Sequence, residues 1–302
     1  MKEKLTQRSD YPKGLKGGEV LIFNKLVGAV FLAGLSVGAR GCSDCLDRHS
    51  SILEVGTTAV VSRIQNQRLS EPTLVVTFGD STTATRGSLN IFAKQLEERL
   101  KSNSHPVRVI NAGIPSNNTR DALQRLDHDV ISQHPKIATI FFGINDSAVE
   151  VFNGDTQPRV SLQEYETNLT RITELLGRNE IQPIIMTPNP VGWTDRLKEL
   201  YGKPPYRPED PDGWNVVLKD YAQAARRVAR ARRVPLVDVY RVFESYAAKP
   251  GRNLNDLMLD GMHPNDLGHT IIANLLIEAI QNIPGFEALE DPKPQRLHAQ
   301  VF

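Results

Sequence analysis

The sequence predicts an α/β protein, a three-layer α/β/α sandwich around a five-stranded, mostly parallel sheet. From Thr73 onward, short runs of Val, Ile, Leu and Phe alternate with longer stretches of helical periodicity. Such alternation is typical of β-α-β units with right-handed crossovers. The short runs are continuously apolar, which is typical of parallel strands buried on both faces.

The individual elements follow from these patterns. The expected strands are 74–78, 107–111, 137–142, 182–187 and 235–239, and the expected helices are 88–101, 118–132, 162–178, 215–233 and 265–282. In the third helix, Leu162, Tyr165 and Leu169 fall on one stripe, and Ser161 with Glu164 forms a candidate capping box ahead of it. Because ligands bind outside the carboxyl ends of such strands, residues just past those ends are candidate site residues.

The 302 residues suffice for one α/β domain plus extensions. We assign 73–285 to that domain, 42–72 to a connector of undecided structure and 286–302 to a C-terminal tail. Prolines, which interrupt helices and central strands, recur through 188–214 and predict an insertion loop. It carries four large aromatic residues: Trp193, Tyr201, Tyr206 and Trp214. Long loops in compact domains are often functional, so we interpret it as a cleft wall or lid, with plain aromatic packing as the alternative.

Residues 1–41 are expected to form a signal or membrane-anchoring leader. Lysines precede the apolar run 26–37, which has the length of a signal-peptide core and is too short for an ordinary spanning helix. Small residues up to Gly41 offer a cleavage site, and Cys42 offers a lipidation site, although Arg40 fits the lipoprotein pattern poorly. We therefore expect export, to the periplasm, the medium or a membrane anchor, with a cytoplasmic location as the alternative. Membrane contact is expected only through this leader.

Composition argues against several partners and cofactors. The formal net charge is +1, and no basic cluster is interleaved with aromatic residues, so we expect no nucleic-acid partner. Cys42 and Cys45 are the two cysteines of the chain. No strand precedes them as a thioredoxin-like motif requires, and two thiols do not complete a structural zinc site. A local disulfide or two free thiols are the expected states, and neither a metal nor a cofactor is expected.

Four short motifs carry chemistry. Gly79-Asp80-Ser81 follows the first expected strand, Asn111-Ala112-Gly113 closes the second, and Gly143-Ile144-Asn145-Asp146 follows the third. Asp260-Gly261-Met262-His263 precedes the last expected helix. Each motif alone is ordinary turn or helix-start chemistry. Together, in one α/β pattern, they supply a hydroxyl, a base and an acid, the groups that serine attack on an acyl carbonyl needs.

The residues suggest individual roles. Ser81 is the candidate nucleophile and His263 the base, since the imidazole pKa lies near neutral pH. Pro264 suits the first turn of a helix, which would place His263 near the N-cap, where the helix dipole favours the neutral ring. Asp260 is positioned to orient that ring. Asp80 and Asp146 are expected to hold their loops by accepting hydrogen bonds from backbone N–H groups.

These four motifs, in this order, resemble those of the SGNH hydrolases, often called GDSL esterases, over roughly residues 73–282. The resemblance implies a flavodoxin-like version of the predicted fold and an oxyanion hole formed by the N–H groups of Ser81 and Gly113 and the side-chain amide of Asn145. Gly113 lacks a Cβ, so its backbone can approach a ligand, and Asn145 offers an uncharged donor. The chain departs from the family pattern at Thr82, where leucine is common.

The expected function is therefore that of a serine ester hydrolase acting on a small acyl ester through an acyl-enzyme. An O-acetyl carbohydrate esterase is the first choice, with Trp193 and Trp214 as sugar-stacking residues; a lysophospholipase or acyl thioesterase is the alternative. Outside this class we keep a non-catalytic binding domain and a metal-dependent phosphoesterase, whose candidate ligands are Asp80, Asn145, Asp146 and His263. Four other histidines are expected to be surface or capping residues: His105, His128, His134 and His269.

Overall fold

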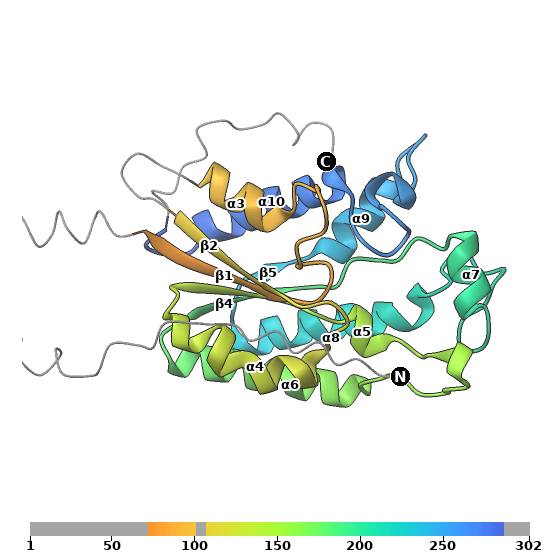
Figure 1. Cartoon of the computed structure of the whole chain (residues 1–302), viewed down its shortest axis with the longest axis horizontal. Helices are drawn as coiled ribbons and strands as arrows, with labels where there is room; N and C mark the ends of the chain where they lie inside the picture. Colours follow the sequence, from red (N-terminus) through yellow and green to blue (C-terminus); the bar gives the residue numbers. More distant parts are fainter. Residues whose placement is uncertain (1–71, 101–106, 287–302) are drawn as a thin grey trace, which may run out of the picture. The chain divides into compact units, whose positions relative to one another are not determined.

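Residues 72–100 and 107–286 are described by the computed structural model of the chain (Figure 1). The expected leader 1–41, nearly all of the connector 42–72 with Cys42 and Cys45, His105, and all but the first residue of the expected tail 286–302 lie outside them. No helix among the described residues combines the length and the apolar character needed to span a bilayer.

Five parallel strands form one sheet in the order β2-β1-β3-β4-β5 (Figure 1). The strands are β1 (Thr73–Gly79), β2 (Val107–Gly113), β3 (Ile137–Phe141), β4 (Gln182–Met186) and β5 (Leu236–Val237). The predicted parallel α/β sheet is confirmed. β5 is shorter than the expected strand 235–239, because the Asp238 side chain accepts a hydrogen bond from Arg241 N–H and caps a helix that begins at Val239.

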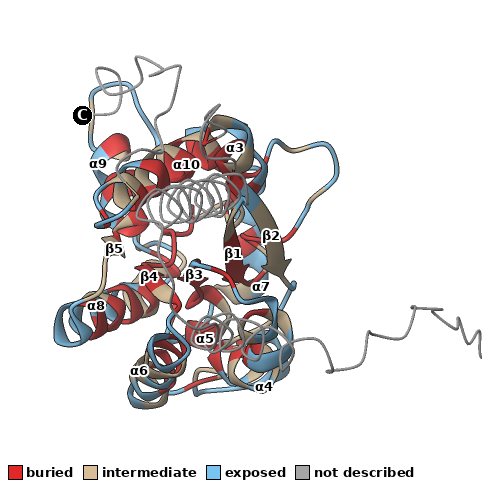
Figure 2. Cartoon of the chain, turned by 90° about the vertical axis from the view of Figure 1, so that its left-hand side faces the viewer, coloured by how far each residue is buried: buried red, intermediate tan, exposed pale blue. Residues whose placement is uncertain are grey.

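Helices cover both faces of the sheet (Figures 1 and 2). One face carries α3 (Phe92–Arg99), α9 (Val239–Ala247) and α10 (Asp266–Gln281), and the other carries α4 (Thr119–Asp129), α6 (Leu162–Arg178) and α8 (Asn215–Arg232). Successive strand residues point to opposite faces, so Val75 joins the core beneath α3 and α10 while Val76 joins the core beneath α4, α6 and α8. This two-sided burial explains why the strands read as continuous apolar runs.

Several short elements were not predicted from the sequence. They are α5 (Ile144–Ser147), α7 (Asp195–Tyr201) and the 3₁₀ turns η1 (Ile131–Gln133), η2 (Val151–Asn153) and η3 (Leu254–Leu257). α9 was not predicted either, since a strand was expected over 235–239. α7 lies inside the expected loop 188–214, where the Thr194 side chain accepts a hydrogen bond from Leu197 N–H and starts the helix. The prolines of this insertion therefore do not keep it free of helix.

The aromatic residues of the insertion 188–214 pack largely against one another. The rings of Tyr206 and Trp214 stack with centroids 5.0 Å apart, and Tyr201 meets Trp214 edge-on at 4.3 Å. Trp214 is 1% exposed, so its expected contact with a sugar is wrong: the ring is covered by its aromatic neighbours. Trp193, by contrast, is only partly buried.

Candidate active site

The ends of three neighbouring strands bring the early motifs to one edge of the sheet. In the strand register, Gly79 of β1 lies beside Gly113 of β2 and Phe141 of β3. Ser81 follows Gly79 by two residues, and Asn145 follows Phe141 by four. The expectation that Ser81, Gly113 and Asn145 share the carboxyl edge of the sheet is confirmed by this register.

Backbone hydrogen bonds fix the turn that presents Ser81. The N–H groups of Thr83 and Ala84 both donate to the carbonyl oxygen of Asp80, at 3.2 and 3.0 Å. Thr82 N–H donates to Asp80 Oδ1 at 2.8 Å, as expected for an Asp that holds its own turn. None of these bonds involves the Ser81 hydroxyl, so the turn is held without it.

The end of β2 packs directly on this turn. A Cβ at position 113 would lie 2.3 Å from the Ala84 nitrogen, so only glycine lets the two backbones meet here. Asn111, two residues earlier, donates from Nδ2 to the Thr83 carbonyl at 2.8 Å. Its Oδ1 accepts from the N–H of Gly113 at 2.9 Å. Asn111 belongs to one of the four motifs but had no role predicted from the sequence; the structure shows that it ties β2 to the Ser81 turn.

The late motif forms a turn that its own carboxylate organises. Asp260 Oδ1 accepts hydrogen bonds from the backbone N–H groups of Met262 and His263, at 3.0 and 2.9 Å. Gly261 has φ +88°, in the left-handed region that favours glycine. The Asp260 carboxylate is thereby held against the backbone and the ring of His263, with its side chain 38% exposed.

The expected position of Pro264 in the first turn of the last helix is wrong, although His263 does lie near the N-cap. The N-cap of α10 is Asn265, whose side chain accepts a hydrogen bond from Gly268 N–H at 3.0 Å. Pro264 instead pairs with Met258 in an isolated antiparallel bridge. His263 therefore lies two residues before the N-cap, and Asp260, in direct contact, is the charge that faces its ring.

Ser81, His263 and Asp260 form one hydrogen-bonded chain. His263 Nε2 lies 3.0 Å from Ser81 Oγ, and its Nδ1 lies 2.8 Å from Asp260 Oδ2. These distances are in the range in which a base takes a proton from a nucleophile and a carboxylate orients the base. Partial burial acts to raise the pKa of Asp260, but hydrogen bonds from the ring and backbone N–H of His263 more than offset it, so the pKa falls below its ordinary value.

The three expected oxyanion donors differ in how they are engaged. Ser81 N–H has no hydrogen-bond partner among the described residues. Asn145 donates from Nδ2 to the Asn117 carbonyl at 3.0 Å, which leaves its second amide proton for an oxyanion. Gly113 has only one N–H, and Asn111 Oδ1 already accepts it. An oxyanion would have to share that proton, and the role of Gly113 stays a prediction.

Asn189 links the turn that carries Ser81 to the turn that carries His263. Its Oδ1 lies 3.5 Å from the Thr82 hydroxyl, next to Ser81, and its Nδ2 donates to the Met262 carbonyl at 3.0 Å, next to His263. The side chain is fully buried. Thr82, which departs from the family's leucine, thus has a buried polar partner. Sequence reasoning missed Asn189 because its neighbours, Pro188 and Pro190, marked it as an ordinary loop residue.

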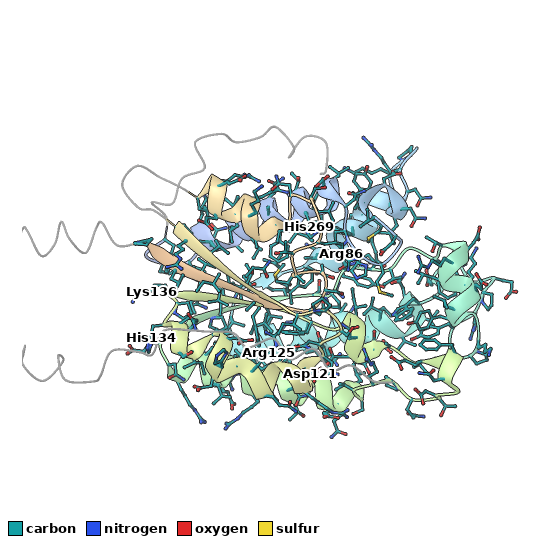
Figure 3. The ribbon with its side chains drawn as sticks, viewed as in Figure 1. Arg86, Asp121, Arg125, His134, Lys136 and His269 are labelled. Atoms are coloured by element: carbon teal, nitrogen blue, oxygen red, sulfur yellow. The ribbon has the colours of Figure 1, made fainter. Side chains whose placement is uncertain are left out.

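Arg125 of α4 ties the loops of the site together from below the sheet, on the face opposite His269 (Figure 3). Its guanidinium lies 4.3 Å from the ring centroid of Phe78. From there it donates to the carbonyl oxygens of Gly79 and Ala112, at 2.8 and 2.9 Å, and to Asn117 Oδ1 at 2.7 Å. One side chain therefore holds the ends of β1 and β2 and the loop that positions Asn145.

Two buried carboxyl groups lie under the site. Burial raises the pKa of Asp80 to about 6, against hydrogen bonds from Thr82 that lower it. Burial also raises the pKa of Asp146 to about 7; hydrogen bonds from Thr119 lower it and the charge of Asp80 raises it further. Asp146 Oδ1 accepts from Thr119 N–H at 2.9 Å, which confirms its expected role of holding a loop. Asp146 Oδ2 is buried without a hydrogen-bond partner.

Replacing Asp146 with asparagine is expected to flatten the dependence of stability on pH. Since the pKa of Asp146 is raised from 3.8 to about 7, the folded chain keeps a proton that the unfolded chain loses in this interval, and the free energy of unfolding falls as pH rises through it. Asp146→Asn removes this titration. The decrease in the free energy of unfolding between pH 5 and pH 8 should therefore be smaller by at least about 1 kcal/mol. Urea denaturation at both pH values measures it. The exposed control Asp155→Asn should keep the full fall; an unchanged fall in Asp146→Asn would contradict the assignment.

None of the three other histidines that the structure describes is part of the site. His269 was expected to be a surface or capping residue, but it is 3% exposed and stacks on Phe92 with ring centroids 5.9 Å apart. Burial lowers its pKa to about 4, so it packs as a neutral ring. His128 and His134 are exposed, as expected. Within the described residues, no three side chains of His, Cys, Asp or Glu gather into a potential metal site.

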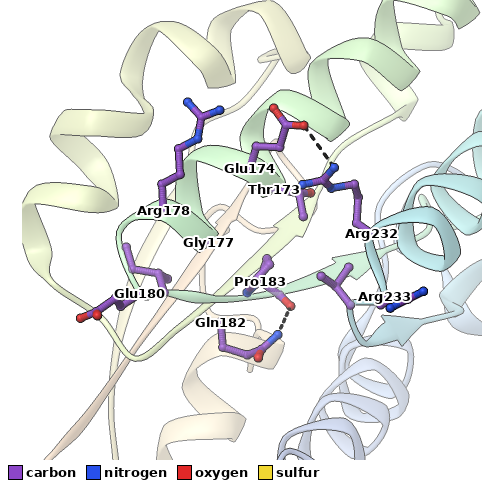
Figure 4. Close-up of a pocket in the computed structure, with 11 residues that line it drawn as sticks. Thr173, Glu174, Gly177, Arg178, Glu180, Gln182, Pro183, Arg232 and Arg233 are labelled. Atoms are coloured by element: carbon purple, nitrogen blue, oxygen red, sulfur yellow. Dashed lines mark hydrogen bonds and ion pairs between the residues drawn. The ribbon is translucent and has the colours of Figure 1, made fainter.

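A separate pocket of about 610 Å³ lies at the opposite edge of the sheet (Figure 4). Gln182 and Pro183 at the start of β4 line it, together with the carboxyl-terminal parts of α6 and α8, where Arg232 pairs with Glu174 at 3.2 Å. Three arginines, Arg178, Arg232 and Arg233, line it together with Glu174 and Glu180. It takes no part in the Ser81 site.

Comparisons with known proteins agree with this geometry. The sequence model of the GDSL-like Lipase/Acylhydrolase family matches residues 77–271. The chain belongs to this family. The resemblance drawn from the four motifs is thereby confirmed, and the chain is a member of a family of ester hydrolases.

Individual relatives fit the same family. The chain is similar to the lipoprotein YqeF of Bacillus subtilis (strain 168), with 34% identity over 56% of this chain and 71% of that protein. It is 28% identical to the isoamyl acetate-hydrolyzing esterase 1 homolog of Rattus norvegicus, over 73% of this chain and 90% of the relative. The acetylxylan esterase of Geobacillus stearothermophilus is 27% identical over 60% of this chain and 74% of its own length.

Solved structures share the fold. A lipase/acylhydrolase from Enterococcus faecalis superposes with a TM-score of 0.53 at 25% identity, covering 69% of this chain and 95% of that one. Axe2, the acetylxylan esterase from Geobacillus stearothermophilus, superposes with a TM-score of 0.56 at 21% identity, covering 70% and 95%. At these identities the Axe2 superposition speaks for the fold alone.

Proposed function

We propose that the protein is a serine carboxylic ester hydrolase that works through a covalent acyl-enzyme. The observation that carries this proposal is the chain of contacts from Ser81 Oγ through the His263 ring to Asp260, at 3.0 and 2.8 Å. Ser81 Oγ attacks the ester carbonyl carbon while His263 Nε2 takes its proton. His263 then returns the proton to the departing alkoxide, and a new C–O bond links the acyl group to Ser81.

Water completes the cycle by the reverse sequence. His263 takes a proton from a water molecule, the hydroxide attacks the acyl carbon, and the bond to Ser81 Oγ breaks as the proton returns to it. Each attack forms an oxyanion. Ser81 N–H and the second amide proton of Asn145 are the donors available to it, with Gly113 N–H as the third. Removing one such donor costs about 3–4 kcal/mol of transition-state stabilisation in comparable hydrolases.

We further propose that the acyl group is acetyl and that the alcohol is a carbohydrate. Two relatives support the acetyl group by name: one is an isoamyl acetate-hydrolyzing esterase homolog and one is an acetylxylan esterase. The name of the acetylxylan esterase also supports a carbohydrate as the alcohol. The lysophospholipase and thioesterase alternatives require a long acyl chain, so the length preference of the enzyme separates them from this proposal.

Two measurements test the proposed reaction. A fluorophosphonate probe is expected to add one label per chain, and peptide mass analysis should place it on Ser81. A series of p-nitrophenyl esters should be hydrolysed fastest at acetate, with kcat/KM falling by about tenfold or more by octanoate, which corresponds to about 1.4 kcal/mol. Labelling at another residue would contradict the assigned nucleophile, and a preference for octanoate would favour the long-chain alternatives.

We also propose that the protein is exported. The apolar run 26–37 has the length of a signal-peptide core, and the relative YqeF is named a lipoprotein. In a bacterial host, intact-mass analysis should find a chain shortened near Gly41 in the periplasmic, secreted or membrane fraction. An added lipid mass would identify Cys42 as the first residue. A full-length chain confined to the cytoplasm would contradict export.

A further inference from the structure

A polar pocket of about 400 Å³ lies at the carboxyl end of the sheet, between the insertion 188–214 and η3. The insertion contributes Trp193, Lys198, Glu209 and Asp210, and the η3 segment contributes Asn253 and Asn255. This volume falls within the range of small-ligand sites, about 300–1,000 Å³. Unlike the pocket in Figure 4, it lies at the same edge of the sheet as Ser81.

The wall of this pocket is continuous with the segment that braces the proposed triad. Asn189 bonds to the Met262 carbonyl, and Gly192 N–H donates to the Gly261 carbonyl at 2.6 Å. Trp193 follows immediately. Four residues span at most about 14 Å even when fully extended, so the Trp193 backbone lies within that distance of Asn189. The segment that contacts Thr82, next to Ser81, therefore leads directly into the wall of the pocket.

The indole of Trp193 is held in place and only partly covered, with the Gly213 backbone packed against it. Its Nε1 donates to the Pro208 carbonyl at 3.1 Å, which fixes the ring plane, and the residue remains partly exposed and lines the pocket. A fixed aromatic face beside polar groups is suited to a molecule that presents both C–H and O–H groups. Trp193 thus remains available to a ligand at this pocket, whereas Trp214 is buried.

The polar lining has unused hydrogen-bonding capacity. The side chains of Asn255 and Glu209 make no hydrogen bond or ion pair with other described residues, and both are exposed. Asp210 uses one oxygen to accept from Asp212 N–H at 3.0 Å, which leaves its second oxygen. An amide and two carboxylates offer acceptors and donors to hydroxyl groups. The two carboxylates outnumber the one lysine of the lining, Lys198, which disfavours an anionic headgroup. Burying the carboxylates under an alkyl chain would leave them unsolvated.

We propose that this pocket binds the alcohol portion of the substrate, and that this portion is a neutral polyhydroxylated group such as a sugar. Trp193 packs against its C–H face, while Asn255, Glu209 and Asp210 bond its hydroxyls. The inference rests on the proposed esterase function for its link to catalysis, but the binding itself does not require turnover.

Kinetics on two esters test whether binding in this pocket contributes to catalysis at Ser81. Trp193→Ala and Asn255→Ala are compared with the native protein on acetylated xylobiose and on methyl acetate, whose alcohol is too short to fill the pocket. Each variant should lose about tenfold in kcat/KM on the sugar ester, which corresponds to about 1.4 kcal/mol, and less than twofold on methyl acetate. The control Phe152→Ala removes another exposed aromatic residue, 48% exposed and outside the pocket lining, and should change neither. Equal losses on both esters, or no loss on the sugar ester, would overturn the proposal.

A direct measurement of sugar binding tests this pocket independently of the proposed esterase activity. The chain has two tryptophans, and Trp214 is buried, so a fluorescence change on adding xylobiose reports Trp193. The change should saturate in the native protein and vanish in Trp193→Phe. If the native protein hydrolyses neither ester but the fluorescence responds, the esterase function fails and the pocket stands. If it hydrolyses both esters and the fluorescence never responds, the pocket assignment fails alone.

Discussion

Replacing Ser81 with alanine is expected to lower kcat for p-nitrophenyl acetate by at least about 10⁴-fold, since removing a nucleophile of this type costs that much or more in comparable hydrolases. The fold should persist, because the turn is held by the carbonyl and carboxylate of Asp80 and not by the Ser81 hydroxyl. Steady-state kinetics measure the loss, and the thermal midpoint checks the fold.

A matched serine variant controls for the substitution itself. Ser132 lies on η1, where its exposed hydroxyl donates to the His128 carbonyl at 2.7 Å. Ser132→Ala should keep kcat within about twofold of the native value, as expected for a surface change away from the site. If Ser81→Ala retained more than a tenth of native kcat, Ser81 would not be the nucleophile.

Replacing Asp260 with asparagine is expected to lower kcat by about 10³–10⁴-fold with little change in KM. An asparagine can turn its NH₂ group toward His263 Nδ1, which favours the tautomer that carries its proton on Nε2. That nitrogen then cannot accept the proton of Ser81. The geometry should survive, because the introduced amide keeps an oxygen for the N–H groups of Met262 and His263, which Asp260 Oδ1 accepts in the native protein.

The chain offers a control with the same spacing from the histidine. Asp266 lies three residues after His263, as Asp260 lies three before it, and its carboxylate accepts a hydrogen bond from Asn90 N–H at 2.8 Å. Asp266→Asn should cost some stability through that contact and leave kcat within about twofold. A similar decrease in kcat in both variants would indicate that the loss of a nearby negative charge, and not the orientation of His263, explains the effect of Asp260→Asn.

The sequence was most informative where function depends on short-range patterns. The strand runs, the glycines at strand ends and the three-residue spacing of Asp260 and His263 are local features, and the parallel register then brings Ser81 to the end of the sheet where Gly113 lies. Helix 162–178 was likewise predicted to the residue, since its stripe of apolar side chains is a local pattern.

Several of the errors have a common physical cause, which is side-chain packing in the folded chain. Trp214 was expected to stack on a sugar, but residues of the same insertion cover it. His269 was expected to be a surface or capping residue, but it is buried against Phe92 of another helix. Asn189 contacts Thr82, 107 residues earlier in the chain. No periodicity or spacing encodes such contacts, because they exist only once the sheet has formed.

Arg125 has a consequence for how proteins of this kind are recognised. It lies outside all four motifs, yet its guanidinium is bonded to the strand ends that carry Gly79 and Ala112 and to Asn117. A homologue with an uncharged residue here would keep every diagnostic motif and would still be classified with the active members. Its loops, however, would lack their shared anchor. A protein can therefore keep all of its catalytic residues and still have them misaligned. Inactive members of the family should first be sought among homologues that lack an arginine at position 125.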